Sequence, residues 1–268
     1  MDIRRLGWAG LEITSHDTTI AIDLFEEIGA MEQFIGAPRE PLPPPSRPLD
    51  AALITHLHVD HADPAALARA LKPGAPVLRP AASTGTGLDP AGTLGAEAGL
   101  KEHSLTTDVV GVGEQRTIGP FTVTAVPAVD GFGDPQVSWV VEADGQRILH
   151  AGDTLFHGSW WTIPMRVGPI HVAFLPINGA VCDFPHRQPP SPLPAVLDPR
   201  QAAVAGHLLQ VSLVVPIHYG AIHAPPLYAQ VDDPAGTFVR EAEALGVPVQ
   251  VVAPGDAVAW PEIQVAAA

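Results

Sequence analysis

Apolar residues recur along this chain in short runs that predict strands alternating with helices. Apolar and polar positions alternate over residues 11–14, and residues 18–22 are β-branched and apolar, so we expect two strands joined by a turn. A buried strand over residues 51–55 is followed by a helix over residues 64–71. Mixed strands and helices in this order indicate the α/β class.

Later apolar runs continue the same pattern to the end of the chain. We expect strands over residues 77–80, 119–126, 136–142, 147–151, 172–176, 213–217 and 247–252, and helices over residues 25–34, 198–211 and 237–245. Residues 37–48, which lie between the helix expected over residues 25–34 and the strand expected over residues 51–55, hold six prolines. We expect them to form a long irregular connection. No boundary separates two cores, so we predict a single domain over residues 1–268.

Composition excludes several classes of protein. The 268 residues are 46% hydrophobic and only 16% charged, which argues against intrinsic disorder. The net charge of −15, without a Lys/Arg cluster, argues against a nucleic-acid partner. The only cysteine, Cys182, excludes an intrachain disulfide and a Cys-rich zinc motif. Because neither a secretory signal nor a membrane-spanning apolar run stands out, we expect a cytoplasmic protein with no membrane partner.

The segment between residues 55 and 61 carries the strongest chemical signal. It holds three imidazoles and one carboxylate, at His56, His58, Asp60 and His61, directly after a buried strand. Imidazole and carboxylate groups are the usual ligands of zinc and similar ions. His56 and His58 point the same way in an extended turn, because side chains alternate with a period of two. We expect two ligands for each of two adjacent metals.

Two further candidates stand at the ends of later predicted strands. Asp153 follows a strand and a glycine, where a carboxylate has two oxygens with which to bridge two cations. His218 directly follows the apolar run over residues 213–217. A dinuclear zinc site needs more ligands than one loop supplies, so both residues are predicted ligands.

With these motifs the chain resembles the metallo-β-lactamase-fold hydrolases over about residues 5–256, and within them the branch similar to L-ascorbate-6-phosphate lactonase. The motifs are His56-x-His58-x-Asp60-His61, Gly152-Asp153-Thr154, Pro216-Ile217-His218-Tyr219-Gly220, Leu6-Gly7-Trp8-Ala9-Gly10, Asp23, Ala125-Val126-Pro127-Ala128 and Leu175-Pro176-Ile177-Asn178-Gly179. The resemblance implies a four-layer αββα sandwich with two divalent metal ions, zinc first, at one edge of the two sheets. It assigns His56 and His58 to the first metal, Asp60, His61 and His218 to the second, and Asp153 to both.

One position departs from the family pattern. The family places a third histidine of the first metal just after the Val-Pro-Ala stretch, where this chain has Asp130. An aspartate binds zinc but adds negative charge and favours harder ions, so manganese and iron are alternatives. Asp130 is the predicted ligand, with Asp134 as the second choice.

Substrate-facing residues are predicted from their place near the metal edge. Asp60 would bind its metal and orient the nucleophile, and His186 would donate a proton or bind the substrate. Arg187, Asn178 and His223 are the predicted substrate-binding residues, with an anionic group of the substrate placed near Arg187.

The leading functional hypothesis is a hydrolase that uses a metal-bound hydroxide to cleave a small lactone, amide or ester. A redox or other non-hydrolytic metal enzyme on the same fold is an alternative, and a degenerate ligand-binding protein is another. The expected partner is a small molecule, and a homo-oligomer is left open.

Overall fold

Two six-stranded sheets form the centre of the molecule. The computed structural model describes residues 1–85 and 92–261. The first sheet has the order β1 (Asp2–Gly7), β2 (Gly10–Ser15), β3 (Thr18–Ile22), β4 (Ala51–Leu53), β5 (Val77–Arg79) and β6 (Thr107–Val109). Strands β1 to β3 are antiparallel, whereas β3 to β6 run parallel.

The second sheet repeats this mixture of directions. Its order is β13 (Leu213–Ile217), β11 (Val172–Pro176), β10 (Gln146–His150), β9 (Val137–Ala143), β8 (Phe121–Pro127) and β7 (Gln115–Ile118). Strands β7 to β10 are antiparallel, and β10, β11 and β13 are parallel. A small separate ladder joins β12 (Val181–Cys182) to β14 (Tyr228–Ala229).

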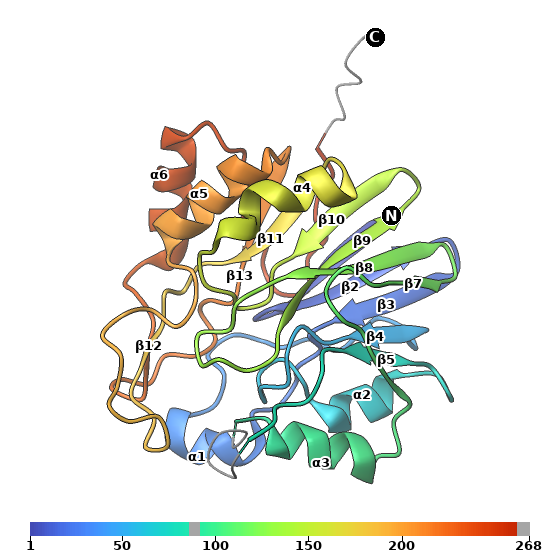
Figure 1. Cartoon of the computed structure of the whole chain (residues 1–268), viewed down its shortest axis with the longest axis horizontal. Helices are drawn as coiled ribbons and strands as arrows, with labels where there is room; N and C mark the ends of the chain where they lie inside the picture. Colours follow the sequence, from blue (N-terminus) through green and yellow to red (C-terminus); the bar gives the residue numbers. More distant parts are fainter. Residues whose placement is uncertain (86–91, 262–268) are drawn as a thin grey trace.

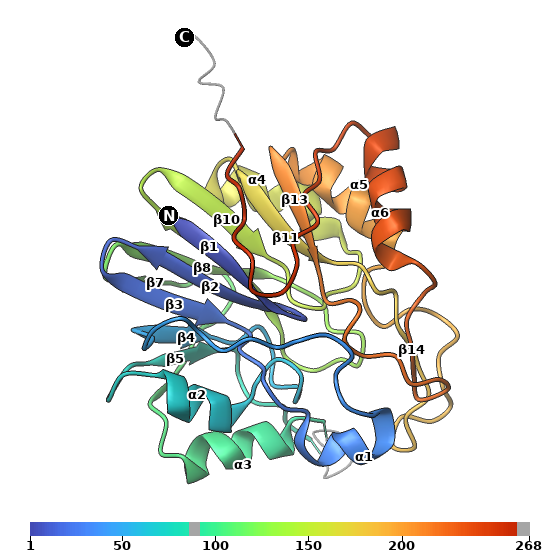
Figure 2. The ribbon, with the colours of Figure 1, turned by 180° about the vertical axis from the view of Figure 1, so that it is seen from behind.

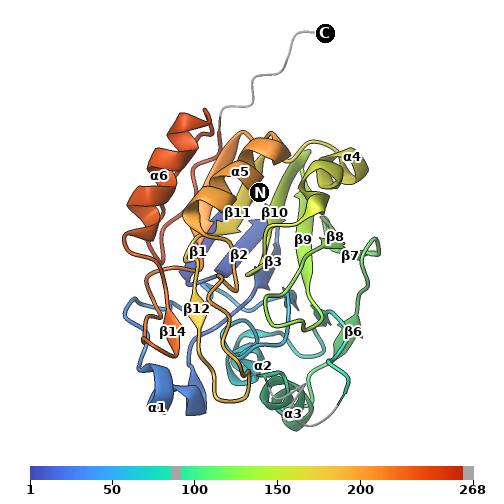
Figure 3. The ribbon, with the colours of Figure 1, turned by 60° about the vertical axis from the view of Figure 1, so that its left-hand side comes forward.

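Helices cover the outer face of each sheet, so the molecule has four layers (Figure 1). Helices α2 (Pro64–Ala70) and α3 (Leu94–Glu102) cover the first sheet, and α4 (Thr162–Val167), α5 (Pro199–Leu209) and α6 (Pro234–Ala244) cover the second. The 3₁₀ helix η3 (Gly158–Trp161) leads into α4, while η1 (Gly29–Met31) and α1 (Glu32–Ile35) lie near β12 and β14 (Figure 3). The predicted αββα architecture is confirmed.

Three buried clusters fill the spaces between these layers. The largest lies between the two sheets and includes Ile13 and Ile22 of the first and Val123 and Trp139 of the second. The other two lie under the helices of the second and first sheets, respectively. Burial of this much apolar surface is the main force that holds the sheets together.

The strand directions bring several chain segments to one edge of the sandwich. Strands β3, β4, β8, β10 and β13 all end at this edge. In the first sheet β3 and β4 are parallel. In the second sheet β10 and β13 both run parallel to β11, and β8 has the same direction as β10 because each is antiparallel to β9. The view from behind shows that the connection between β3 and β4 carries α1, which lies below β14 (Figure 2). The loops that carry the predicted ligands therefore meet at this edge.

The helices predicted over residues 64–71 and 198–211 are confirmed as α2 and α5, and both begin with strong capping residues. Asp63 caps α2 through the backbone N–H of Ala66, with Pro64 as the first helical residue. Asp198 forms a capping box with Gln201 at the start of α5.

Three expectations about secondary structure are wrong. The N-terminal region has three strands, since β1 precedes the two predicted ones. The expected helix over residues 25–34 is η1 followed by the single turn of α1. The expected strand over residues 247–252 is only a bridge between Val249 and Val214, because Val247 bonds back to α6 and Pro248 has no N–H to donate.

Among the described residues, the helices are too short and insufficiently apolar for any of them to cross a membrane.

Candidate metal centre

The loop between β4 and α2, here called the ligand loop, carries four candidate metal ligands. It is anchored by Asp23, the residue after β3. The Asp23 carboxylate accepts hydrogen bonds from the backbone N–H of Thr55 at 2.8 Å and from its hydroxyl at 2.7 Å. Asp23, Thr55 and His56 are all fully buried. The loop therefore leaves the strand in a fixed direction, with its histidines inside the protein.

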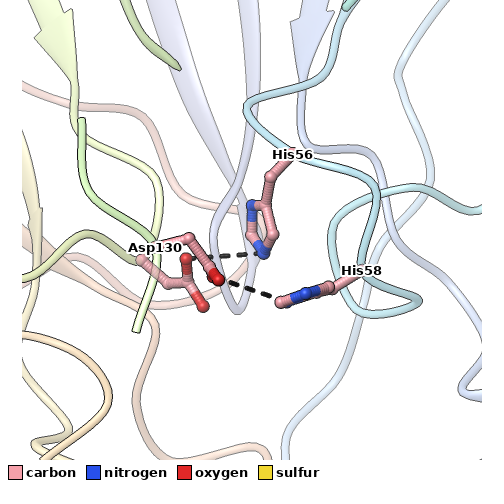
Figure 4. Close-up of side chains that lie close together, drawn as sticks. His56, His58 and Asp130 are labelled. Carbon is pink, nitrogen blue, oxygen red and sulfur yellow. Dashed lines mark ion pairs between the residues drawn. The ribbon is translucent and has the colours of Figure 1, made fainter. Parts of the chain in front are cut away.

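His56, His58, Asp130 and Asp153 form the first ligand group. Each offers one ligand atom, and these atoms lie within 4.8 Å of one another. His56 Nε2 is 3.4 Å from Asp153 Oδ1, and His58 Nδ1 is 3.8 Å from Asp130 Oδ1. Figure 4 shows the two rings and the Asp130 carboxylate facing a common point.

Neighbouring side chains select which nitrogen of each ring faces that point. His56 Nδ1 is 3.1 Å from the Thr55 hydroxyl, which leaves Nε2 toward the ligand group. His58 Nε2 is 2.9 Å from Asp134 Oδ2, which leaves Nδ1 toward Asp130. A hydrogen-bond partner on the nitrogen that faces away from the ligand group fixes the orientation of the ring. It also raises the basicity of the nitrogen that faces the group, as is usual for metal-binding histidines.

Asp130 and Asp134 have different places in the structure. One oxygen of Asp130 accepts from the backbone N–H groups of Phe132 and Asp134, each at 2.8 Å, and the other faces the ligand group. Asp134 instead holds His58 and also bonds to Ser83 and, at 3.2 Å, to Arg187. The structure thus places Asp130 among the candidate ligands and Asp134 behind one of them.

Asp60, His61 and His218 form the second ligand group. The Nε2 atoms of His61 and His218 face each other at 3.0 Å, and Asp60 Oδ2 is 3.6 and 3.5 Å from them. His61 Nδ1 is 2.8 Å from Asp23, and the indole N–H of Trp8 donates to Asp60 at 3.0 Å. The three candidate ligand atoms therefore converge, and hydrogen bonds with Asp23 and Trp8, which lie outside the group, orient His61 and Asp60.

His218 is held by Trp8 as well. Its backbone adopts a positive φ of 57°, which is uncommon for histidine. The His218 N–H donates to the carbonyl oxygen of Trp8 at 2.9 Å, and the two rings lie 4.0 Å apart. The left-handed turn after β13 thus aims the imidazole at the ligand loop.

Burial and mutual contacts shift the pKa values of the clustered carboxylates and imidazoles strongly and in different directions. Burial raises the pKa of Asp153 to about 7, although His61 opposes this. Burial lowers the pKa of His61, but Asp60 and Asp23 outweigh it and raise that pKa to about 10. For His218, burial dominates and lowers the pKa to about 4. Closely packed carboxylates and imidazoles with such divergent pKa values are typical of functional sites.

A cavity opens in front of the two ligand groups. The candidate ligand residues His58, Asp60 and Asp153 contribute to its lining. The rest of the lining is mainly apolar and includes Ile28, Met31, Ile35, Ile222, Phe132, Phe184 and Val196. Any substrate in this cavity would therefore contact both candidate metal ligands and apolar side chains.

The four predicted substrate-facing residues separate into two pairs. His186 and Arg187 line the cavity, where His186 stacks on Phe184. The described lining includes neither Asn178 nor His223. Asn178 is fully buried and donates to the Tyr228 hydroxyl at 2.8 Å, so it reaches the cavity only through that residue.

Several residues of the site had no role assigned from the sequence. Asp23 and Trp8 belong to motifs of the resemblance, but their contacts with His61 and Asp60 depend on the fold. Tyr228 lines the cavity from β14, and only its hydrogen bond with Asn178 reveals its orientation.

Known proteins match the chain along most of its length. A family model described as the β-lactamase superfamily domain matches residues 18–219. A UPF0173 metal-dependent hydrolase of Thermococcus kodakarensis is 31% identical over 195 residues, covering 69% of this chain and 73% of the relative. Another of Rubrobacter xylanophilus is 31% identical over 218 residues, covering 78% of each chain.

A solved structure shows the same fold. Igni18 of Ignicoccus hospitalis, described as a metallo hydrolase, superposes with a TM-score of 0.67 at 21% identity over 96% of this chain and 97% of that protein. The chain therefore belongs to the UPF0173 family of metal-dependent hydrolases, with the metallo-β-lactamase fold.

Proposed function

We propose that this metal-dependent hydrolase binds two divalent ions, zinc first, and cleaves a small lactone, amide or ester. A lactone is the first choice because the motifs resemble the branch similar to L-ascorbate-6-phosphate lactonase. The observation that carries the proposal is the convergence of seven buried or half-buried ligand residues into two adjacent groups.

The ligand atoms fit metal ions because several of them have no other partner. His56 Nε2, Asp130 Oδ1 and Asp153 Oδ1 are buried and accept or donate no hydrogen bond among the described residues. Buried polar atoms in this state are costly unless a cation satisfies them. In the second group, two imidazole nitrogens face each other at 3.0 Å, where a divalent cation would replace the proton that they share.

Divalent ions held here would supply a Lewis acid and lower the pKa of water enough to make it a nucleophile near neutral pH. The chain's own residues orient and enclose the reaction. Trp8 fixes the Asp60 carboxylate, which faces the cavity and is placed to orient the attacking water. The apolar side chains that line the cavity would exclude other water once a substrate is bound and would strengthen the electrostatic interactions inside.

The cavity favours a substrate with a small apolar part. Its volume of about 170 Å³ is close to the ~150 Å³ of an apolar protein cavity that accepts benzene. Ile28, Met31, Ile35 and Ile222 would contact that group. An anionic substituent would lie beside Arg187, which also pairs with Asp134 and lies over Phe132.

His186 is better suited to accept a proton or a hydrogen bond than to donate a proton. Burial and the neighbouring Arg187 lower its pKa, so the imidazole is mostly neutral at pH 7.

The experiment compares metal-free and zinc-loaded protein in the hydrolysis of dihydrocoumarin, an aryl lactone, and p-nitrophenyl acetate, an aryl ester. We expect no hydrolysis after chelation and recovery on addition of two zinc equivalents. His61→Ala should abolish the recovery, whereas the matched control His103→Ala, at an exposed residue after α3, should not. Hydrolysis that survives complete metal removal would contradict the proposal.

A second candidate function rests on the donor set. Asp60, His61 and His218 are two imidazoles and one carboxylate, a set that also serves non-haem iron in oxygen chemistry. Oxygen consumption by iron-loaded protein, absent with zinc, would favour this redox function over hydrolysis.

A further inference from the structure

Tyr228 stands at the cavity without a role in the proposed metal site. It lies in β14, where it pairs with Cys182 of β12, and both residues line the cavity together with His58, Asp60 and Asp153. Its ring centroid is 6.4 Å from that of Trp8, which itself bonds to Asp60. The tyrosine is therefore close to the second ligand group and is only 8% exposed.

The Tyr228 hydroxyl is oriented by Asn178. The Asn178 Nδ2 group donates to the hydroxyl oxygen at 2.8 Å, while Asn178 Oδ1 faces the backbone N–H of Ala180 at 3.4 Å. That second contact determines which end of the amide faces the tyrosine. The hydroxyl oxygen thus accepts a hydrogen bond and retains its own O–H for donation.

No acceptor for the Tyr228 O–H occurs among the described residues. Buried tyrosine hydroxyls usually have a partner, and here the residue faces a cavity lined by candidate metal ligands. A ligand oxygen in the cavity would supply the missing acceptor. Burial, reinforced by the Asp60 carboxylate and by Cys182, raises the pKa of Tyr228 well above its ordinary value, so the hydroxyl keeps its proton near neutral pH.

We propose that Tyr228 is a catalytic residue that donates a hydrogen bond to the carbonyl oxygen of the substrate, and that Asn178 positions it. The inference rests on the proposed hydrolysis. The water oxygen bonds to the carbonyl carbon, and the π electron pair moves onto the carbonyl oxygen, where the Tyr228 O–H stabilises the negative charge without giving up its proton. Collapse re-forms the carbonyl and breaks the bond to the leaving group, which takes a proton originating from the water.

The first test replaces only the hydroxyl. In zinc-loaded Tyr228→Phe we expect kcat for dihydrocoumarin and p-nitrophenyl acetate to fall by about 100-fold. KM should change little, because the hydrogen bond strengthens mainly in the transition state. Bound zinc and the melting temperature should stay as in the wild type. The matched control is Tyr219→Phe, since Tyr219 is equally exposed at 8% but stacks on Arg5, and it should leave the rates unchanged.

A double-mutant cycle tests the positioning role of Asn178. Asn178→Ala should lower kcat in the wild type but have almost no further effect in Tyr228→Phe, because it acts through the lost hydroxyl. A purely structural role would make the two effects additive, which would overturn this part of the proposal.

A binding measurement separates this inference from the proposed function. Calorimetry with benzoate, a carboxylate probe, and zinc-loaded protein requires no turnover. We expect Tyr228→Phe to weaken benzoate binding by about tenfold, as for a hydrogen bond to a charged group, and Tyr219→Phe to leave it unchanged. If the wild type hydrolyses neither ester nor lactone yet shows this difference, the proposed hydrolysis fails while hydrogen-bond donation by Tyr228 stands. Equal rates and affinities in wild type and Tyr228→Phe, or no binding by either, would overturn the assignment.

Discussion

The two ligand groups sit side by side and share the ligand loop and Asp23, but their remaining supports come from different parts of the molecule. The second group is fixed by residues on the first sheet and its turns, since Asp23 orients His61 and Trp8 orients both Asp60 and His218. The first group depends on the loop after β8, where Asp130 is fixed by backbone N–H groups and Asp134 orients His58.

The two groups also differ in their donors. The group supported by the loop after β8 holds the carboxylate Asp130, whereas the second group holds His218 directly after a buried strand. A loop adjusts its backbone to a shorter side chain more easily than a buried strand end does. We therefore expect a change in a residue that supports one group alone, such as Asp134 or Trp8, to affect one ion while sparing the other.

The largest expected effect comes from Asp153→Asn. Asp153 is a candidate ligand with an unpartnered buried oxygen, so its charge is lost where nothing replaces it. We expect zinc affinity of the first group to fall by more than the ~100-fold upper value for residues that only support a ligand. Zinc titration calorimetry measures this, with Asp17→Asn, at an exposed turn, as the matched control. An unchanged titration would remove Asp153 from the site.

Asp23→Asn should weaken the second group by about 100-fold. The amide presents an N–H₂ to a site where His61 and Thr55 both need an acceptor. The same loss should lower the free energy of unfolding of metal-free protein by about 3 kcal/mol, measured by urea denaturation. The first group should weaken less, because Asp23 reaches His56 only through Thr55, and an equal loss of zinc affinity in both groups would contradict this difference.

Acid should weaken zinc binding by roughly tenfold per pH unit below neutrality. In the metal-free protein, His61 has a pKa of about 10 and Asp153 a pKa of about 7, so both hold protons at pH 6 that metal binding must displace. Raising the pH removes this competition, and affinity rises with pH. The pKa of His218, about 4, adds no competition near neutrality. Titrations in buffers with different ionisation enthalpies count the released protons, and a pH-independent affinity would contradict the expectation.

Asp134→Asn should have the smallest effect, about tenfold on the first group alone. Asp134 lies behind His58 and shares its carboxylate between His58, Ser83 and Arg187, so His58 loses orientation but no ligand atom is lost. Anomalous diffraction at limiting zinc would show lower occupancy beside His58 and full occupancy beside His218. Equal loss at both positions would contradict the separation of the two groups.

Much of the site was predictable because most of its candidate ligands either lie together in one loop or directly follow apolar strands. Four candidate ligands lie in one loop, and Asp153 and His218 follow strands that the apolar pattern identifies. Their supports were not predictable, since the contacts of Asp23 with His61 and of Asn178 with Tyr228 join residues distant in sequence.

The missed elements of the fold have physical reasons as well. Strand β1 carries two arginines, and Arg5 is 1% exposed because it pairs with Glu40 and stacks on Tyr219. Buried arginine is rare, so a search for apolar runs does not find this strand. The residues after α6 look like a strand by composition, but Pro248 interrupts the donors that a ladder requires.

The most direct test is a crystal structure of zinc-soaked protein with anomalous scattering at the zinc edge. Two peaks are predicted, one bounded by His56, His58, Asp130 and Asp153 and the other by Asp60, His61 and His218, with ligand distances near ~2 Å. Zinc only at other places, or none beside His218 and His58 in hydrolytically active crystals, would contradict the account.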